Sequence, residues 1–174
     1  IMSVMAGEDV QDEFVPLAYD QCGFRPWIDR SAMPDRTPPP PGFKVLVIGA
    51  GLTGMAASTK LAEAGYDHVV IEKNPEVGGT WYENRYPGVG VDTPSHFYSY
   101  SWEIWSDWQY YHPHGTDMQR YMLEVADKYD LRRHIRFDTK VEELVYDDAA
   151  GTWTVTVRKS DGSSETIIAN AVIN

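Results

Sequence analysis

The chain has 174 residues, of which 43% are hydrophobic, and its formal net charge is -11 at pH 7. This length is enough for one domain with a core, or for one domain plus an extension, but not for two nucleotide-binding domains. The charge disfavours nucleic acid and anionic lipid surfaces as partners, and no apolar run approaches the roughly 20 residues of a membrane span.

One cysteine, Cys22, excludes an internal disulfide and a cysteine-rich metal site. With no secretory signal in the sequence, this predicts a cytoplasmic location. The chain begins at Ile1, and its end, Ala171–Asn174, resembles an apolar strand cut before its turn. We therefore expect a fragment of a larger protein.

Residues 1–42 predict an irregular arm and linker. Hydrophobic residues of the arm, such as Phe14 and Trp27, follow no sustained period. Four consecutive prolines, Pro38–Pro41, then predict an extended and semi-rigid connector. The domain proper is expected over residues 43–174.

An apolar run followed by three glycines predicts a phosphate-binding turn. The run Val45–Ile48 is typical of a parallel strand buried on both faces. Gly49 permits the tight turn, Gly51 allows the backbone to approach a pyrophosphate, and Gly54 allows the next helix to pack close to the strand.

The helix is expected over Leu52–Ala64, with Gly65 as its C-terminal stop. Its first amides, which include those of Leu52 and Thr53, would face the anion. Gly54, Ala57, Leu61 and Ala64 are expected on one face of this helix, and the small residues among them would allow that face to pack closely.

A second strand, His68–Ile71, ends in Glu72, about 20 residues after the glycines as in dinucleotide-binding folds. The carboxylate of Glu72 can accept hydrogen bonds from a ribose diol, and it would repel a 2'-phosphate. This favours FAD or NAD over NADP, and Lys73 is assigned to the same site. The alternative is a solvated acid at the end of a strand.

Later segments predict a helix and a β-meander. Thr116 and Gln119 have the spacing of a capping box before a helix that extends to about Tyr129. The period then becomes two, and predicts strands over 141–146, 153–157 and 165–168, followed by a parallel strand at Ala171–Ile173. We expect an α/β, Rossmann-like FAD-binding domain with a parallel sheet and an inserted antiparallel β-meander, truncated.

The loop between these parts carries a family resemblance. The segments Gly78–Tyr82 and Asn84–Gly88, with Asp92, resemble the segment after the second strand in Baeyer-Villiger monooxygenases. The resemblance continues through Tyr98–Ser101 and covers the chain from Lys44 to its end. The arm resembles that of N-terminally extended members of the 4-hydroxyacetophenone monooxygenase type.

The resemblance implies a reaction and its cofactors. In this family NADPH reduces FAD, and the reduced flavin uses O2 to insert oxygen into a small-molecule ketone, giving an ester or a lactone. FAD would bind this chain, whereas most of the NADPH site would lie outside it. The oligomeric state is not implied.

The resemblance also assigns site residues. It places Gly79, Thr80, Trp81 and Arg85 at the flavin and its phosphates, and the backbone of Val141 at the adenine. Trp81 could instead be a core aromatic residue and Arg85 a surface cation.

Two further residues would lie near the flavin ring. Tyr98 would lie against the isoalloxazine, although it too could belong to the core. Asp92 would be the catalytic residue that orients an arginine outside this chain, although it could equally be a turn residue. Many family members have an arginine where this chain has Gly90, which puts any cofactor contact there in doubt.

Other functions remain as alternatives. The same fold could oxygenate nitrogen or sulfur, or the chain could be a non-catalytic nucleotide-binding module. His112 and His114 lack an accompanying cluster of ligands, so no metal site is predicted. Paired redox cysteines after the first helix are absent from the sequence, which excludes a disulfide reductase.

Overall fold

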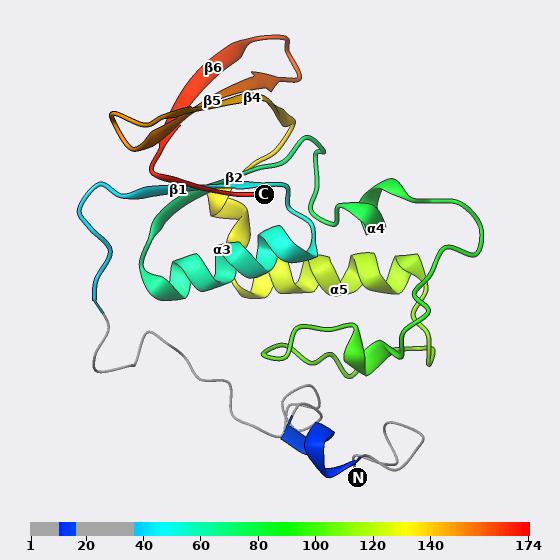
Figure 1. Ribbon diagram of the computed structural model, residues 1–174. Coiled ribbons are helices and arrows are strands. Elements are labelled where there is room, and N and C mark those ends of the chain that lie inside the picture. Colours follow the sequence, from blue (N-terminus) through cyan, green and yellow to red (C-terminus); the bar gives the residue numbers. More distant parts are fainter. Residues whose placement is uncertain (1–10, 17–36) are drawn as a thin grey trace. The chain divides into compact units, whose positions relative to one another are not determined.

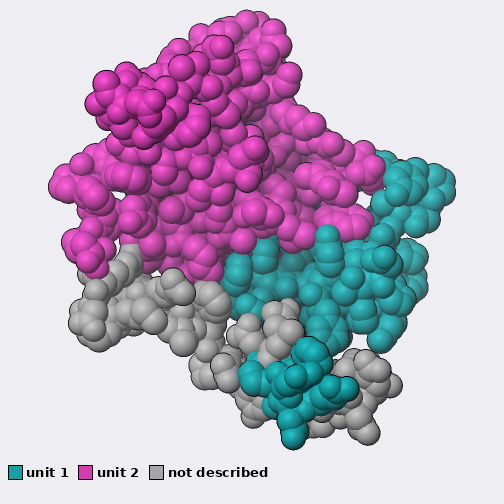
Figure 2. Space-filling view, viewed as in Figure 1, with its two compact units in different colours: residues 1–28, 85–121 teal, residues 29–84, 122–174 magenta. Residues whose placement is uncertain are grey.

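The computed structural model describes residues 11–16 and 37–174 (Figure 1). The chain forms two compact units, one of residues 1–28 and 85–121 and the other of residues 29–84 and 122–174 (Figure 2). Within the predicted arm the structure describes a short 3-10 helix, η1 (Asp12–Phe14). The predictions for Cys22 and Trp27 lie outside the described residues.

The second unit is built on a parallel sheet. Its strands are β1 (Lys44–Ile48), β2 (Asp67–Ile71), β3 (Ile135–Arg136) and β7 (Ala171–Ile173), in the order β3-β2-β1-β7. All three neighbouring pairs in this sheet are parallel. The inner strand β1 supplies the buried residues Val45, Leu46 and Val47. The predicted α/β, Rossmann-like fold is therefore confirmed.

Helix α3 (Leu52–Ala64) follows β1 and covers one face of the sheet (Figure 1). It ends as predicted at Gly65, whose φ of 74° is left-handed and whose N–H donates to the carbonyl of Ala62. Of the face predicted to pack closely, only Gly54 is fully buried, because the helix is turned so that Met55 enters the core. The remaining buried residues of the helix are Ser58 and Thr59.

An antiparallel meander packs on the other face of the parallel sheet (Figure 1). Its strands are β4 (Thr139–Asp147), β5 (Thr152–Lys159) and β6 (Ser164–Ala169), in the order β4-β5-β6. Val155, Val157 and Ile167 of the meander form one apolar cluster with Leu46 and Ile71 of the sheet. The meander lies between β3 and β7 in the sequence, which confirms the predicted insertion.

The described residues 85–121 of the first unit are mostly irregular. They include η3 (Ser95–Phe97) and the beginning of α5 (Gly115–Lys128). Tyr121 organises their aromatic residues, because its hydroxyl accepts from the N–H of Tyr100 and donates to the carbonyl of Glu103, both at 2.8 Å. The rings of Trp105 and Trp108 lie 5.9 and 5.5 Å from the ring of Tyr121.

The capping box predicted at Thr116 is wrong. Helix α5 begins at Gly115, and the carboxylate of Asp117 accepts from the N–H of His114 at 3.3 Å. The earlier start follows from the preceding chain, because His114 forms a β-bridge with Gly90 and the N–H of Gly115 donates to the carbonyl of Val89 at 2.9 Å. The chain is therefore already fixed in place one residue before Thr116.

A stacked pair of histidines lies between β2 and η4 (Leu131–His134). The ring of His68 is 4.0 Å from that of His134, and its Nδ1 lies 3.1 Å from the carbonyl of Tyr66. Since a carbonyl only accepts, Nδ1 carries the proton, and Nε2 of neutral His68 accepts from the hydroxyl of Ser58 at 2.8 Å. Nε2 of His134 accepts from Arg133 at 3.0 Å. Both rings are therefore placed as neutral imidazoles.

The histidine pair predicts a loss of stability in mild acid. Burial lowers the pKa of His68, and burial together with the neighbouring Arg133 lowers that of His134, despite the opposing charges of Asp67 and Asp130. The unfolded chain then binds more protons below its ordinary histidine pKa of 6.5. The free energy of unfolding should be constant above this pH and fall below it, by at most about 1.4 kcal/mol per pH unit for each histidine.

Urea denaturation between neutrality and mild acid, above the range where carboxylates titrate, measures this slope. The double variant His68→Gln/His134→Gln should have a clearly smaller slope than the unchanged chain. An equal slope in the two proteins would contradict the assignment to this pair.

Candidate dinucleotide-binding site

A cavity of about 330 Å³ lies where β1 and β2 end, in the unit that contains the parallel sheet. In open α/β sheets, ligands bind outside the carboxyl ends of the strands. The residues that line the cavity are Ile48, Gly49, Gly51, Ile71, Glu72, Lys73, Gly79, Glu83, Thr139, Lys140 and Val141. The site is thus assembled from the glycine turn, the end of β2, helix α4 (Thr80–Glu83) and the beginning of β4.

Two glycines of the turn are needed by the fold itself. Gly49 has a φ of 87°, and its N–H donates to the carbonyl of Ile71 at 2.8 Å. A Cβ at Gly54 would lie 1.9 Å from the carbonyl oxygen of Gly49, so no side chain fits there. The third glycine differs, because a Cβ at Gly51 would meet the Cα of Gly79 at an ordinary 3.8 Å. Packing within the fold therefore does not require a glycine at position 51, and Gly51 lines the cavity.

The beginning of helix α3 is suited to an anion. The N-cap residue is Gly51, which has no side chain to satisfy the first amides of the helix. The first turn, which starts with Leu52 and Thr53, brings no carboxylate. The partial positive charge of the helix N-terminus is therefore available to a pyrophosphate.

Glu72 is buried at the end of β2, with 3% of its surface exposed. Its Oε2 accepts from the N–H of Ala50 at 2.6 Å and its Oε1 from the N–H of Asn74 at 2.8 Å. An ionised carboxylate has about four acceptor positions, so two remain for ribose hydroxyls. Sequence reasoning assigned Glu72 to the ribose but missed that it also holds the glycine turn.

A second pair of glycines packs against the first turn. The N–H of Gly78 donates to the carbonyl of Ala50 at 3.0 Å. Gly78 and Gly79 have φ values of 132° and 52°, and a Cβ at Gly79 would lie only 3.0 Å from the Cα of Gly51. The two turns are therefore in contact through their backbones.

An ion pair fixes α4 at the edge of the cavity. Nζ of Lys73 lies 2.9 Å from a carboxylate oxygen of Glu83, which also accepts from the side chain of Asn74 at 2.9 Å. The hydrogen bond to Glu83 raises the pKa of Lys73, and the bonds from Asn74 and Lys73 lower that of Glu83. Lys73 is thus at the predicted site, with Glu83 as an unpredicted neighbour.

The meander supplies the remaining wall. Val141 lines the cavity, as do Thr139 and Lys140, which sequence reasoning missed. The N–H of Thr139 donates to the carbonyl of Glu72 at 2.9 Å, which fixes the beginning of β4 beside the end of β2. The register of β4 against β5 shifts between Val141 and Glu143, and such bulges redirect side chains near binding sites.

The other predicted residues do not line this cavity. Thr80 is exposed at the beginning of α4, and Trp81 is buried with 8% of its surface exposed. Arg85 and Asp92, both exposed, and Tyr98, half-buried, belong to the other unit. Their roles at a flavin stay predictions.

Gly90 has a local reason to be glycine. A Cβ at Gly90 would lie 3.0 Å from the carbonyl oxygen of Pro113, across the bridge to His114. A larger residue would push these two segments apart. The departure from the family pattern at Gly90 therefore coincides with close packing inside this unit.

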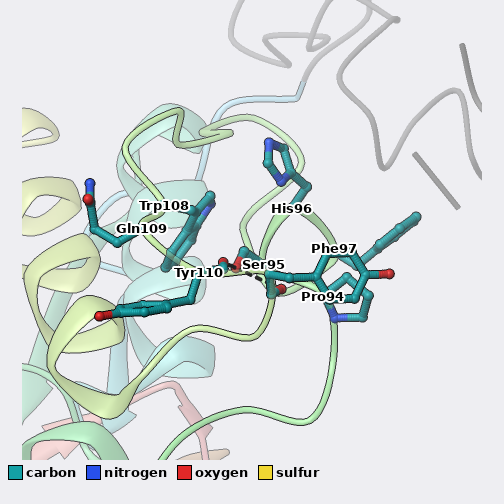
Figure 3. A pocket seen from close by; sticks show the side chains of 8 residues that line it. Pro94, Ser95, His96, Phe97, Trp108, Gln109 and Tyr110 are labelled. Carbon is teal, nitrogen blue, oxygen red and sulfur yellow. Dashed lines mark hydrogen bonds between the residues drawn. The ribbon is translucent and has the colours of Figure 1, made fainter. Parts of the chain in front are cut away.

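The first unit contains a cavity of its own, of about 470 Å³ (Figure 3). The N–H of Ser95 donates to the carbonyl of Tyr111 at 2.8 Å, and its hydroxyl donates to the carbonyls of Tyr110 and Tyr111. The lining residues are Pro94, Ser95, His96, Phe97, Trp108, Gln109, Tyr110 and Tyr111. Ser95 thus joins the two segments that form this cavity.

Comparison with known proteins agrees with the geometry of the sheet unit. The profile of a family described as "NAD(P)-binding Rossmann-like domain" matches residues 47–116. A Baeyer-Villiger monooxygenase of Streptomyces coelicolor is 39% identical over 117 residues, which are 66% of this chain and 22% of that protein. The chain is a relative of the class B flavin monooxygenases.

Solved structures lead to the same group. A crystal structure of OTEMO in complex with FAD and NADP has a TM-score of 0.66 and 34% identity, and the match covers 77% of this chain and 25% of that one. A cyclohexanone monooxygenase bound to epsilon-caprolactone has a TM-score of 0.66 and 36% identity over 74% of this chain and 25% of that one. The matched region corresponds to the N-terminal, FAD-binding portion of these monooxygenases.

The chain spans about a fifth of the length of the curated relatives that it matches. Among the described residues, no helix has both the length and the apolar character that crossing a membrane requires.

Substituting the two inner glycines separately should distinguish folding from binding. Gly54→Ala places a methyl group against the Gly49 carbonyl and should lower the free energy of unfolding by about 1–3 kcal/mol or more. Gly51→Ala has room and a φ of -80°, so its stability should stay within about 0.5 kcal/mol of the unchanged chain. Urea denaturation measures both.

Gly51→Ala also tests whether the cavity binds a dinucleotide, because the backbone at this glycine is where a pyrophosphate approaches in dinucleotide-binding folds. Weaker FAD binding is the expected result. Fluorescence titration with FAD gives the dissociation constant. Gly51→Ala with unchanged affinity would contradict the role assigned to this glycine.

Proposed function

We propose that the chain binds the adenosine diphosphate part of FAD in the 330 Å³ cavity. The observation that carries this proposal is the buried carboxylate of Glu72, held by two backbone amides at the end of β2 and beside the glycine turn. In this proposal the pyrophosphate lies at the beginning of α3, the ribose diol bonds to Glu72, and the adenine lies along the backbone of Val141.

Two observations favour FAD over NADP as the ligand here. The carboxylate of Glu72 would repel the 2'-phosphate of NADP. The meander that completes the cavity is typical of flavin-binding domains. When bound, FAD would supply the redox chemistry, and this chain would hold and orient it.

Titration of the purified 174-residue chain with FAD tests the proposal. Saturable quenching of flavin fluorescence, with competition by ADP, is the expected result. A chain that is folded by circular dichroism but binds neither FAD nor ADP would overturn it. That result would instead favour a module that does not bind a dinucleotide.

The variant Glu72→Gln tests the ribose contact. An amide can accept through one oxygen only, and its NH2 group would face a backbone donor, so FAD binding should weaken about tenfold or more. Because the repelling charge is also lost, the preference for ADP-ribose over its 2'-phosphorylated form should shrink.

Glu63→Gln is the matched control for this variant. Glu63 pairs with Lys60 on α3 and does not line the cavity. Its affinity and its ligand preference should both be unchanged. An equal loss of FAD affinity in the two variants would show that removing any acidic residue has this effect, and would refute the ribose contact.

For the whole protein that contains this chain, we propose oxygen insertion into a ketone with NADPH and O2, giving an ester or a lactone. The support is the loop resemblance and the Baeyer-Villiger relative of Streptomyces coelicolor. Asp92 would orient an arginine outside this chain, and Arg85 and Tyr98 would contact the flavin. The 174-residue chain alone should not turn over.

Paired substrates decide between the proposed reaction and its nearest alternative. A longer protein that contains this sequence is incubated with NADPH, O2 and either a ketone or an amine or sulfide. Ester or lactone formation is expected. N-oxide or sulfoxide as the exclusive product would assign nitrogen or sulfur oxygenation, and NADPH oxidation without any oxygenated product would refute both.

Two finer proposals rest on the sequence. The N-terminal arm supports an aryl ketone as substrate, as for the 4-hydroxyacetophenone monooxygenase type. Cysteine usage supports a cytoplasmic location. Comparing the turnover of aryl and cyclic aliphatic ketones by the longer protein tests the first of these.

A further inference from the structure

An ion-pair network lies beside the candidate site without touching the cavity. Its centre is Arg132 in η4, whose guanidinium makes a bidentate contact with Glu76, through Nη1 at 2.7 Å and Nη2 at 3.2 Å. The remaining edge of the guanidinium donates from Nε to Asp127 at 2.7 Å. Arg132 therefore joins the loop after β2 to the end of α5.

The loop residue that Arg132 binds is two positions before the glycine pair of the cavity. Oε1 of Glu76 also accepts from the N–H of Val77 at 2.8 Å, and Val77 is completely buried. The next N–H, that of Gly78, donates to the carbonyl of Ala50 in the glycine turn. Hydrogen bonds at three consecutive residues, Glu76, Val77 and Gly78, thus connect Arg132 with the glycine turn beside the cavity.

We propose that Arg132 is a positioning residue for the dinucleotide site, which acts through Glu76 to hold Gly78 and Gly79 against Gly51. The inference rests on the proposed function, because it concerns the same cavity. Gly79 lines the cavity and its φ of 52° leaves little freedom next to Gly51, so a small shift of this loop changes the shape of the site.

The shape of the guanidinium distinguishes this role from that of an ordinary surface pair. Exposed pairs contribute only about 0–1 kcal/mol to stability. Arg132 has a bidentate contact on one side and a second acceptor, Asp127, on the other, and the hydrogen bonds from Glu76 and then Asp127 raise its pKa. A lysine cannot reproduce this planar geometry, so Arg132→Lys keeps the positive charge but loses the bidentate contact with Glu76.

The experiment compares FAD affinity and stability in four variants of the 174-residue chain: Arg132→Lys, Arg132→Met, Glu76→Gln and the double variant Arg132→Met/Glu76→Gln. FAD affinity should fall about tenfold in each of the first three. The double variant should lose no more than Arg132→Met alone, because both residues act through one contact. Denaturation of the unliganded proteins should show only the small loss expected for a half-exposed pair.

Arg133→Met is the matched control. Arg133 is the next residue of η4. It forms an ion pair with Asp130 at 3.2 Å, and its Nε donates a hydrogen bond to His134. These partners are separate from Glu76 and from the loop that contains it. Its FAD affinity should be unchanged. Hydrogen exchange gives a second measurement, since the amides of Val77 and Gly78 should exchange faster in Arg132→Lys than in Arg133→Met.

The outcomes separate the inference from the function on which it rests. If the unchanged chain binds neither FAD nor ADP, the proposed function fails. If the unchanged chain binds FAD and Arg132→Lys binds it equally well, Arg132 has no positioning role, whatever its effect on stability. If Arg132→Met does not fold, Arg132→Lys and Glu76→Gln still decide, because they keep the size of the side chains.

Discussion

The cavity depends on one interaction, the pair of backbone amides that bind the carboxylate of Glu72. A buried charge is unfavourable unless hydrogen bonds replace its hydration. The N–H groups of Ala50 and Asn74 provide that replacement, and neither would have this partner without the acid. The same carboxylate therefore joins the glycine turn after β1 to the loop after β2. The ligand contact proposed for Glu72 uses only the acceptor capacity that this structural role leaves.

The second constraint is contact between two backbones. The turn at Gly51 and the turn at Gly79 approach so closely that a Cβ on Gly79 would meet the Cα of Gly51 at 3.0 Å. The close approach therefore requires a glycine at position 79, whereas a Cβ at Gly51 would meet the Cα of Gly79 at an ordinary 3.8 Å. The ion pair of Lys73 with Glu83 and that of Arg132 with Glu76 hold the second turn from its two ends.

Local patterns in the sequence located α3 and the strands of the meander, but they missed α4 and β3 and did not identify the partners of the elements. The bounds of α3 and the final parallel strand follow from periodicity and from glycine positions, and the structure has them as predicted. Thr139 and Lys140 line the cavity where the N–H of Thr139 donates to the carbonyl of Glu72, a contact between distant residues that no local pattern encodes.

Contacts across the sequence explain the remaining failures. The beginning of α5 was misplaced because the residue that fixes it, Gly90, lies far upstream. The polar inner face of α3 was missed because Ser58 is paired with His68 on the neighbouring strand. In both cases the local sequence favours a different structure, and a contact with a distant residue determines the observed one: the bridge to Gly90 for α5 and the hydrogen bond to His68 for α3.

The meander supplies the wall of the cavity on which the proposal of FAD as the ligand depends. A domain that returned directly from β3 to β7 would have the glycine turn and Glu72 but no wall at Lys140 and Val141. The carbonyl of Glu72 fixes the beginning of that wall, while its carboxylate fixes the glycine turn. One residue therefore connects the part of the site common to all dinucleotide folds with the part that favours FAD. In the proposed function this unit would hold the cofactor, and chemistry on a ketone would need further groups.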